Sequence, residues 1–204
     1  MTSETAPSPR PATRREQAKA ARRVEILAAA AQQMAQRGYA GVRLEDIGAA
    51  VGISGPAMYR HFESKSELLD TILVDVSQRL RDGGQLAVEE GGTPTEVLQR
   101  LIGFHIDVLV TRPDLISIQD RDLWSLSDDA RHQVRRLQRS YVELWVDVLV
   151  QRAADRGVEL EAVEARVRTH AMFGLLNSSP RLPAFPLDRL RTLLSAMAMG
   201  ALDG

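Results

Sequence analysis

Hydrophobic residues recur at intervals of three or four along most of this 204-residue chain. Such spacing places them on one face of a helix. It predicts helices at about residues 14–37, 44–51, 55–62, 64–82, 94–111, 114–123, 128–156, 160–176 and 187–201. No stretch of useful length alternates apolar and polar residues as a half-buried strand would, and no internal repeat is present. The pattern therefore predicts an all-α protein of about nine helices.

Residues that cap or interrupt helices support these boundaries. Ser64 and Glu67 form a predicted capping box, in which the hydroxyl accepts from the N–H three residues on and the glutamate reaches back. Thr93 and Glu96 form a second box, with a proline at the first helical position, where a missing N–H costs little. The two glycines at 83–84 predict the end of a helix, followed by a linker over residues 85–92.

The stretch LEDIGAAVGISGPAMYRHF, residues 44–62, has the pattern of two short helices joined by a tight turn. The apolar residues of the first helix share one face, and Met58 and Phe62 lie four residues apart on the second. Gly52 between the helices most easily adopts the left-handed conformation that ends a helix. Such a pair is typical of the helix-turn-helix motif, whose second helix enters the major groove of DNA.

The formal net charge of −1 alone argues against a nucleic-acid partner, but its distribution argues for one. Residues 1–65 hold ten Lys or Arg against six Asp or Glu, and the remainder holds sixteen against twenty-one. A basic N-terminal domain on an acidic body is expected when a DNA-binding domain is joined to a domain with another role. Residues 1–13 are rich in Ser, Thr and Pro and are expected to form a disordered arm.

From Val24 to Leu73 the chain closely resembles the TetR/AcrR family of bacterial repressors. The matching residues are Gly38-Tyr39, Asp46-Ile47, Gly52-Ile53-Ser54, Met58-Tyr59-Arg60-His61-Phe62 and Ser64-Lys65-Ser66-Glu67-Leu68-Leu69. The resemblance implies a TetR-like fold, with a three-helix DNA-binding domain at 14–65 and a larger helical ligand-binding and dimerisation domain at 66–204. It also implies a homodimer that binds a double-stranded DNA operator.

The resemblance further implies which residues contact DNA. These are Arg43, Ser54, Gly55, Pro56, Ala57, Tyr59, Arg60, His61 and Lys65. Tyr59, His61 and Lys65 would bind phosphates, which fixes the register on the duplex without reading its sequence. Ser54 would cap its own helix, reach a phosphate, or both. Arg60 would either contact guanine bidentately or bind another phosphate, and residues 55–57 would lie nearest the base edges.

Two positions depart from the family pattern. Arg43 stands where many members have a threonine that caps the second helix and touches phosphate, so the cap is lost while a charged contact is gained. Gly55 replaces a frequent lysine, which lowers the positive charge at the groove. The arginine-rich segment Arg10–Arg23 would compensate by entering the minor groove.

The last two predicted helices carry apolar stripes that suit the pairing of two chains. The stripes consist of Val163, Val167 and Ala171 on one helix and Leu187, Leu190, Leu194 and Met197 on the other. Two helices from each protomer would form a four-helix interface. The alternative is that both stripes are buried within one chain.

Most aromatic residues of the second domain fall on its middle helices. The candidate ligand pocket consists of Phe104, His105, Leu109, Ile116, Trp124, Tyr141, Trp145 and Phe173. Apolar walls with a few polar groups suit a hydrophobic effector. The segment PDLISIQDRDLWSL resembles one found in regulators that adjoin lipid or acyl-CoA metabolism, which suggests an acyl-CoA or a fatty acid. Each residue taken singly is more simply explained as core packing.

No catalytic constellation is expected. The chain lacks cysteine and has no G-x-S-x-G, Gly-rich phosphate loop or H-E-x-x-H. His105 with Asp107 and His132 with Asp128 have the spacing of metal or base pairs, but a lone histidine on a helix is more often structural. We therefore expect no enzyme activity, cofactor or metal. No apolar run is long enough to span a membrane and no signal core is present, so a cytoplasmic location is expected.

Together these features predict a ligand-responsive DNA-binding repressor that acts as a homodimer and is released by a hydrophobic small molecule. Two alternatives stay open. One is a DNA-binding regulator without an effector, which the failure of every small molecule to release DNA would indicate. The other is a helical lipid-binding protein with a vestigial N-terminal domain, which DNA affinity at physiological salt would exclude.

Overall fold

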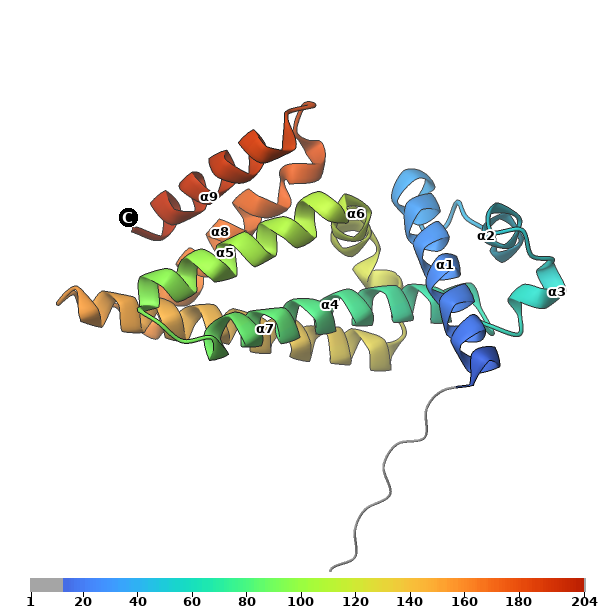
Figure 1. The fold of residues 1–204 in the computed structure, drawn as a ribbon, viewed down its shortest axis with the longest axis horizontal. Coiled ribbons are helices and arrows are strands. Elements are labelled where there is room, and N and C mark those ends of the chain that lie inside the picture. Colours follow the sequence, from blue (N-terminus) through green and yellow to red (C-terminus); the bar gives the residue numbers. More distant parts are fainter. Residues whose placement is uncertain (1–12, 204) are drawn as a thin grey trace, which may run out of the picture.

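The computed structural model describes residues 13–203, which form nine α-helices and two short 3₁₀ helices, with no strand among them. The elements are α1 (Arg14–Arg37), α2 (Leu44–Ala50), α3 (Gly55–Met58), α4 (Lys65–Glu89), α5 (Pro94–Thr111), α6 (Pro113–Asp122), η1 (Leu123–Ser125), α7 (Asp128–Asp155), α8 (Ala162–Asn177), η2 (Ser179–Arg181) and α9 (Leu187–Asp203). Helices α1–α3 form a small unit, here called the head, at one end of an elongated body made of α4–α9 (Figure 1). The predicted all-α fold is confirmed.

The head is held together by apolar side chains from all three of its helices. Ile26 of α1, Ile47 of α2 and Met58 of α3 are fully buried. Helices α2 and α3 cross at Gly48, where an added Cβ would lie 2.8 Å from Met58 Cγ. Gly52 has φ +70°, as the predicted helix-ending turn requires. The helix-turn-helix geometry therefore depends on glycine at two positions.

Helix α4 is longer than the sequence pattern predicts, and the expected linker over residues 85–92 is wrong for most of its length. The helix continues through both glycines to Glu89. A Cβ on Gly83 would lie 2.0 Å from Phe104 Cζ, and one on Gly84 would lie 2.5 Å from Tyr141 Cε2. Glycine in a helix costs about 1 kcal/mol relative to alanine, and here the close approach of two aromatic rings offsets that cost.

The predicted helix caps are partly confirmed. Thr93 and Glu96 form the full box, with the Thr93 N–H donating to Glu96 Oε2 at 2.8 Å. Ser64 Oγ accepts from the Glu67 N–H at 3.0 Å, but the Glu67 carboxylate accepts from the N–H of Glu63 rather than of Ser64. The predicted disordered arm is wrong at Thr13, which caps α1. Residues 1–12 of that arm lie outside the described residues.

In the body, α4 and α7 lie side by side along its length, α5 packs on both, and α9 packs on α5 and α8 (Figure 1). Helix α6 lies where the body meets the head and packs on α1. There Arg121 of α6 donates hydrogen bonds to the carbonyl oxygens of Met34 and Ala35, at the C-terminal end of α1. The head is therefore joined to the body by α4 and by this α6 contact. None of the described helices is long and apolar enough to cross a membrane.

Candidate nucleic-acid interface and ligand site

The predicted recognition helix presents polar side chains to solvent. Ser54, Pro56 and Arg60 are exposed, and Tyr59 has 53 % of its surface accessible. Within residues 13–203, neither Tyr59 nor Arg60 makes a hydrogen bond or ion pair through its side chain. Helix α3 ends at Met58, earlier than predicted, and its chain continues in hydrogen-bonded turns through residue 62. These turns project Tyr59 and Arg60 away from the core formed by Met58.

The predictions for the N-terminal caps of α2 and α3 in the helix-turn-helix have different outcomes. The prediction that Ser54 caps α3 is wrong, because its side chain makes no capping hydrogen bond. Its exposed hydroxyl remains available for the other predicted role, a contact with phosphate. At α2 the backbone N–H of Arg43 donates to Asp46 Oδ2 at 3.3 Å, so the aspartate stabilises the start of the helix where a capping threonine is absent.

Lys65 and His61, both predicted to bind phosphate, differ in their contacts within the head. Lys65 Nζ donates to the Tyr39 carbonyl oxygen at 2.8 Å and lies 4.3 Å from the centroid of the Tyr39 ring. His61 Nδ1 is buried without a hydrogen-bond partner. Lys65 therefore stabilises the α1–α2 connection, and it would have to exchange this contact to reach a phosphate.

The prediction that the arginine-rich segment enters the minor groove is wrong for Arg22 and Arg23. Arg22 Nη1 donates to the Val51 carbonyl at 3.1 Å, and Arg23 Nη1 donates to the His61 carbonyl at 2.7 Å. Arg23 also lies 3.9 Å from the centroid of the Phe62 ring. Both guanidinium groups thus fasten α1 to the helix-turn-helix. The segment is helical from Arg14 onward, and residue 10 lies outside the described part of the chain.

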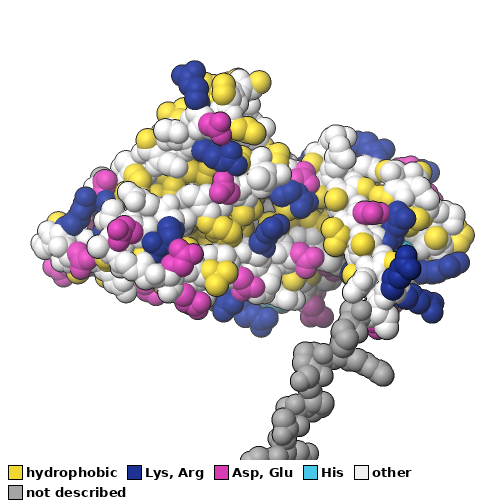
Figure 2. Space-filling model, viewed as in Figure 1, with side chains coloured by type: hydrophobic (Ala, Val, Ile, Leu, Met, Phe, Trp, Pro, Cys, Tyr) yellow, Lys and Arg dark blue, Asp and Glu magenta, His cyan; other side chains and the backbone are white. Residues whose placement is uncertain are grey.

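The outer end of the head is basic. Figure 2 shows Lys and Arg side chains gathered around the first turns of α1 and around α3. Arg14, Arg15 and Lys19 are exposed on α1, and Arg43 and Arg60 are exposed on the helix-turn-helix. Phosphates attract such a surface, because binding releases the counterions condensed on DNA.

Four of the predicted pocket residues form one aromatic cluster in the body. The rings of His105, Tyr141, Trp145 and Phe173 lie with their centroids 4.8–6.1 Å apart. His105 Nδ1 lies 3.1 Å from Tyr141 Oη, and its Nε2 lies 3.4 Å from Asn177 Oδ1. A neutral imidazole protonated on Nε2 satisfies both contacts, donating to Asn177 and accepting from Tyr141. Asn177 was not predicted, and only the fold brings it to this cluster.

Burial decides the ionisation of the cluster. It lowers the pKa of His105 to about 4, because charging the imidazole away from water is costly; the hydrogen bond to Asn177 opposes this only in part. Burial likewise raises the pKa of Tyr141. Both groups are therefore neutral at pH 7, and Trp145 Nε1 is buried without a hydrogen bond of standard geometry. The result is an apolar centre with a few polar atoms.

The remaining predicted pocket residues are not part of this cluster. Trp124 is 73 % exposed and stacks under Arg135, so the prediction that it lines the pocket is wrong. Leu109 and Ile116 are buried core residues. Phe104 lines a separate cavity of about 310 Å³, which also includes Arg79, Arg112 and Arg191, three arginines that the sequence pattern did not single out.

The predicted dimerisation face is largely exposed on the single chain. Val163 and Val167 of α8 are 67 % and 64 % exposed, and Leu187 and Met197 of α9 are 54 % and 45 % exposed. Ala171 is also exposed and Leu190 is half-buried. Leu194 is wrong as an interface residue, because it faces the protomer's own core and is 3 % exposed. Leu193, which was not predicted, is exposed instead.

Comparison with known proteins identifies the chain. Residues 26–72 match the family model described as bacterial regulatory proteins, tetR family, and residues 91–181 match the model described as the tetracyclin repressor-like C-terminal domain. The chain belongs to the TetR family. Transcriptional repressor KstR2 of Mycolicibacterium smegmatis is 28 % identical over 137 residues, 67 % of each chain.

Solved structures share the fold, among them that of a TetR family transcriptional regulator. PfmR from Thermus thermophilus superposes with a TM-score of 0.76 at 26 % identity, covering 88 % of this chain and 97 % of PfmR. AibR, solved in complex with isovaleryl coenzyme A and operator DNA, superposes with a TM-score of 0.72 at 21 % identity, covering 86 % and 97 %. This TetR-family protein is a DNA-binding transcriptional regulator. Within residues 13–203, no group of three or more His, Asp or Glu side chains is placed to hold a metal ion.

Proposed function

We propose that this protein is a homodimeric repressor whose affinity for its operator is lowered by a hydrophobic small molecule that enters the aromatic cluster of the body. The observation that carries the proposal is the course of α4. This helix begins at the end of the head, and its Gly83 and Gly84 lie against the rings of Phe104 and Tyr141. Tyr141 belongs to the aromatic cluster, so a molecule inserted beside its ring displaces α4 at Gly84, and with it the head.

The exposed faces of α8 and α9 support the pairing of two chains. Val163, Val167 and Met197 leave apolar surface in water that a second copy would cover. A two-fold axis through these helices makes a four-helix interface and places two heads on one side of the dimer. The heads must lie about one turn of DNA apart, ~34–36 Å, to enter successive major grooves. An effector acts by favouring a dimer with another spacing.

The effector class is an acyl-CoA or a fatty acid. The cluster offers aromatic walls with the hydroxyl of Tyr141 and the amide of Asn177 as polar groups, which suits an apolar chain with a polar end. The isovaleryl coenzyme A of the AibR complex supports this class by analogy. Such a regulator acts in the cytoplasm, where bacterial operators are found.

The DNA contacts in this proposal come from Tyr59 and Arg60, which are exposed and unpaired within the described chain, and from Ser54, Arg43 and residues 55–57. Arg60 is the candidate for base readout, because a guanidinium matches the O6 and N7 acceptors of guanine. Lys65 contributes to phosphate binding only after it releases the Tyr39 carbonyl oxygen, whereas the half-buried His61 has no side-chain hydrogen bond at Nδ1 to exchange.

The experiment selects the operator from a random duplex library and then measures its release. Fluorescence anisotropy of the labelled operator is followed while fatty acids and acyl-CoAs of increasing chain length are added. We expect release by at least one compound, and a Tyr141→Phe variant that binds the operator normally but needs a different concentration of that compound, since a bound ligand loses one hydrogen bond. Trp124→Phe is the matched control and responds as the parent does.

The packing of the cluster favours one second candidate, a regulator that binds DNA without an effector. In residues 13–203 the four rings fill the centre of the body by contacting one another. If selected operator is bound tightly and no acyl compound releases it, this second function replaces the first. If no duplex is selected at all, both are refuted.

A further inference from the structure

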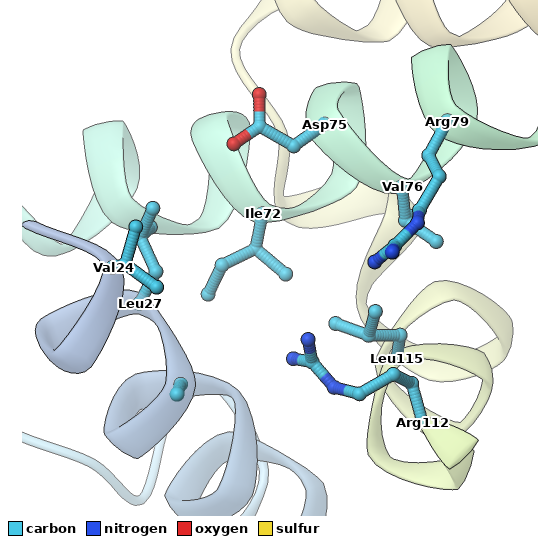
Figure 3. A pocket seen from close by; sticks show the side chains of 9 residues that line it. Val24, Leu27, Ile72, Asp75, Val76, Arg79, Arg112 and Leu115 are labelled. Atoms are coloured by element: carbon cyan, nitrogen blue, oxygen red, sulfur yellow. The ribbon is translucent and has the colours of Figure 1, made fainter. Parts of the chain in front are cut away.

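A cavity of about 230 Å³ lies between α1 of the head and α4 and α6 of the body (Figure 3). We call it the junction cavity. Leu27 of α1, Ile72 of α4 and Leu115 of α6 form apolar walls. Arg79 and Arg112 are also among its lining residues, and both line the neighbouring cavity of about 310 Å³ as well. The two cavities are therefore adjacent and share a pair of arginines.

The two arginines leave positive charge in the junction cavity. Figure 3 shows the guanidinium groups of Arg79, on α4, and Arg112, between α5 and α6, pointing into it. Arg79 has no ion pair or hydrogen bond with any residue in the range 13–203, and Arg112 has one ion pair, with Asp114 at 3.4 Å. Asp75 is the acidic residue of the lining, and in Figure 3 its carboxylate points away from both guanidinium groups.

We propose that the junction cavity binds the acidic group of an amphipathic anion, a carboxylate or a phosphate monoester on an alkyl chain. The guanidinium groups of Arg79 and Arg112 hold the anion, since arginine presents paired N–H donors that match either group. The alkyl chain packs against Leu27 and Ile72 in the junction cavity, or passes Leu115 toward Phe104 in the neighbouring one. This site is separate from the aromatic cluster, whose four rings line neither cavity.

Occupancy of this site couples to the position of the head. One wall of the cavity belongs to the head and two belong to the body. A molecule in the cavity therefore fixes or changes the distance between the head and the body. An anion that binds more tightly at one head position shifts the equilibrium toward it. This regulatory consequence rests on the proposed function, whereas the binding itself does not.

The test is isothermal titration of the full chain with decanoate and with decyl phosphate. The double variant Arg79→Gln/Arg112→Gln removes the charges while keeping polar side chains that carry N–H donors. Arg136→Gln is the matched control, since Arg136 is exposed on α7 and lines neither cavity. We expect both anions to bind the parent and the control equally, and to bind the double variant at least tenfold more weakly. Decanol, which has the same chain without the charge, binds the parent at least tenfold more weakly than decanoate.

Three results would overturn the inference: no binding of either anion, equal binding by the double variant, or equal binding of decanol. The variant Arg79→Lys/Arg112→Lys keeps both charges. It retains anion binding if the glutamine variant loses binding through its missing charges, and it loses binding too if replacing these arginines unfolds the protein. Operator affinity is measured on the same samples without the anion. Equal anion binding by the parent and the double variant, together with normal operator affinity and normal release by the effector, refutes this inference alone. Absent operator affinity refutes the proposed function whatever the anions do.

Discussion

Acidification tests whether His105 is held neutral in the body core. Its folded-state pKa is about 4, against 6.5 when the residue is in water. Between these two values the unfolded chain binds a proton that the folded chain does not, so the free energy of unfolding falls as the pH falls. The stabilisation is fully present above the unfolded pKa, is lost progressively below it, and is gone near pH 4.

The magnitude follows from the shift. One pKa unit corresponds to about 1.36 kcal/mol, so we expect His105 to account for a loss of about 2 kcal/mol between pH 7.5 and pH 5. That window lies above the range in which most carboxylates titrate. Glu16, Glu96 and Asp203, whose pKa values are lowered in the fold, therefore add to the loss mainly at lower pH.

The assay is urea unfolding at pH 7.5, 6.5, 5.5 and 5.0, followed by circular dichroism, for the parent and for His105→Gln. Glutamine retains an amide at the cluster but does not titrate, so the free energy of unfolding of the variant falls by about 2 kcal/mol less across the window. His132→Gln replaces an exposed histidine and keeps the pH dependence of the parent. Identical pH dependence in the parent and in His105→Gln would show that His105 is protonated without penalty, and the burial argument would fail.

Three further predictions concern packing, assembly and DNA contact. Gly83→Ala places a methyl group 2.0 Å from Phe104 Cζ, and we expect thermal unfolding to show that overpacking lowers the free energy of unfolding by about 1–3 kcal/mol; unchanged stability would mean that the ring moves freely. Val167→Glu puts a charge on the exposed face of α8, so light scattering should report a monomer, circular dichroism an intact helical fold and anisotropy a weaker binding of the operator; a persistent dimer would place the interface elsewhere. Arg60→Ala should relax the preference for one base at a single operator position, whereas Tyr59→Phe should weaken binding to all DNA sequences alike. If both variants weaken binding to all sequences equally, Arg60 contacts only phosphate.

The sequence by itself determined the local structure. Three features depend only on neighbours within one or two helical turns: the periodicity of apolar residues, the Thr93 capping box and the left-handed Gly52. They could therefore be predicted without the tertiary structure. For the same reason the helix-turn-helix and its exposed Tyr59 and Arg60 could be predicted. A capping preference competes with other partners, however, and Ser54 does not use it.

Only the tertiary structure decided what distant residues do to one another. In the sequence Gly83 predicts the end of a helix. In the structure the helix continues, because the ring of Phe104 packs against Gly83 and leaves no space for a side chain. Lys65 and Arg23 look like free cations in the sequence, whereas in the fold the carbonyl oxygens of Tyr39 and His61, in turns distant along the chain, accept their hydrogen bonds. The periodicity of α9 predicts its apolar face, but not which part of that face packs on the protomer's own core. The sequence therefore could not predict that Leu194 is buried and Met197 exposed.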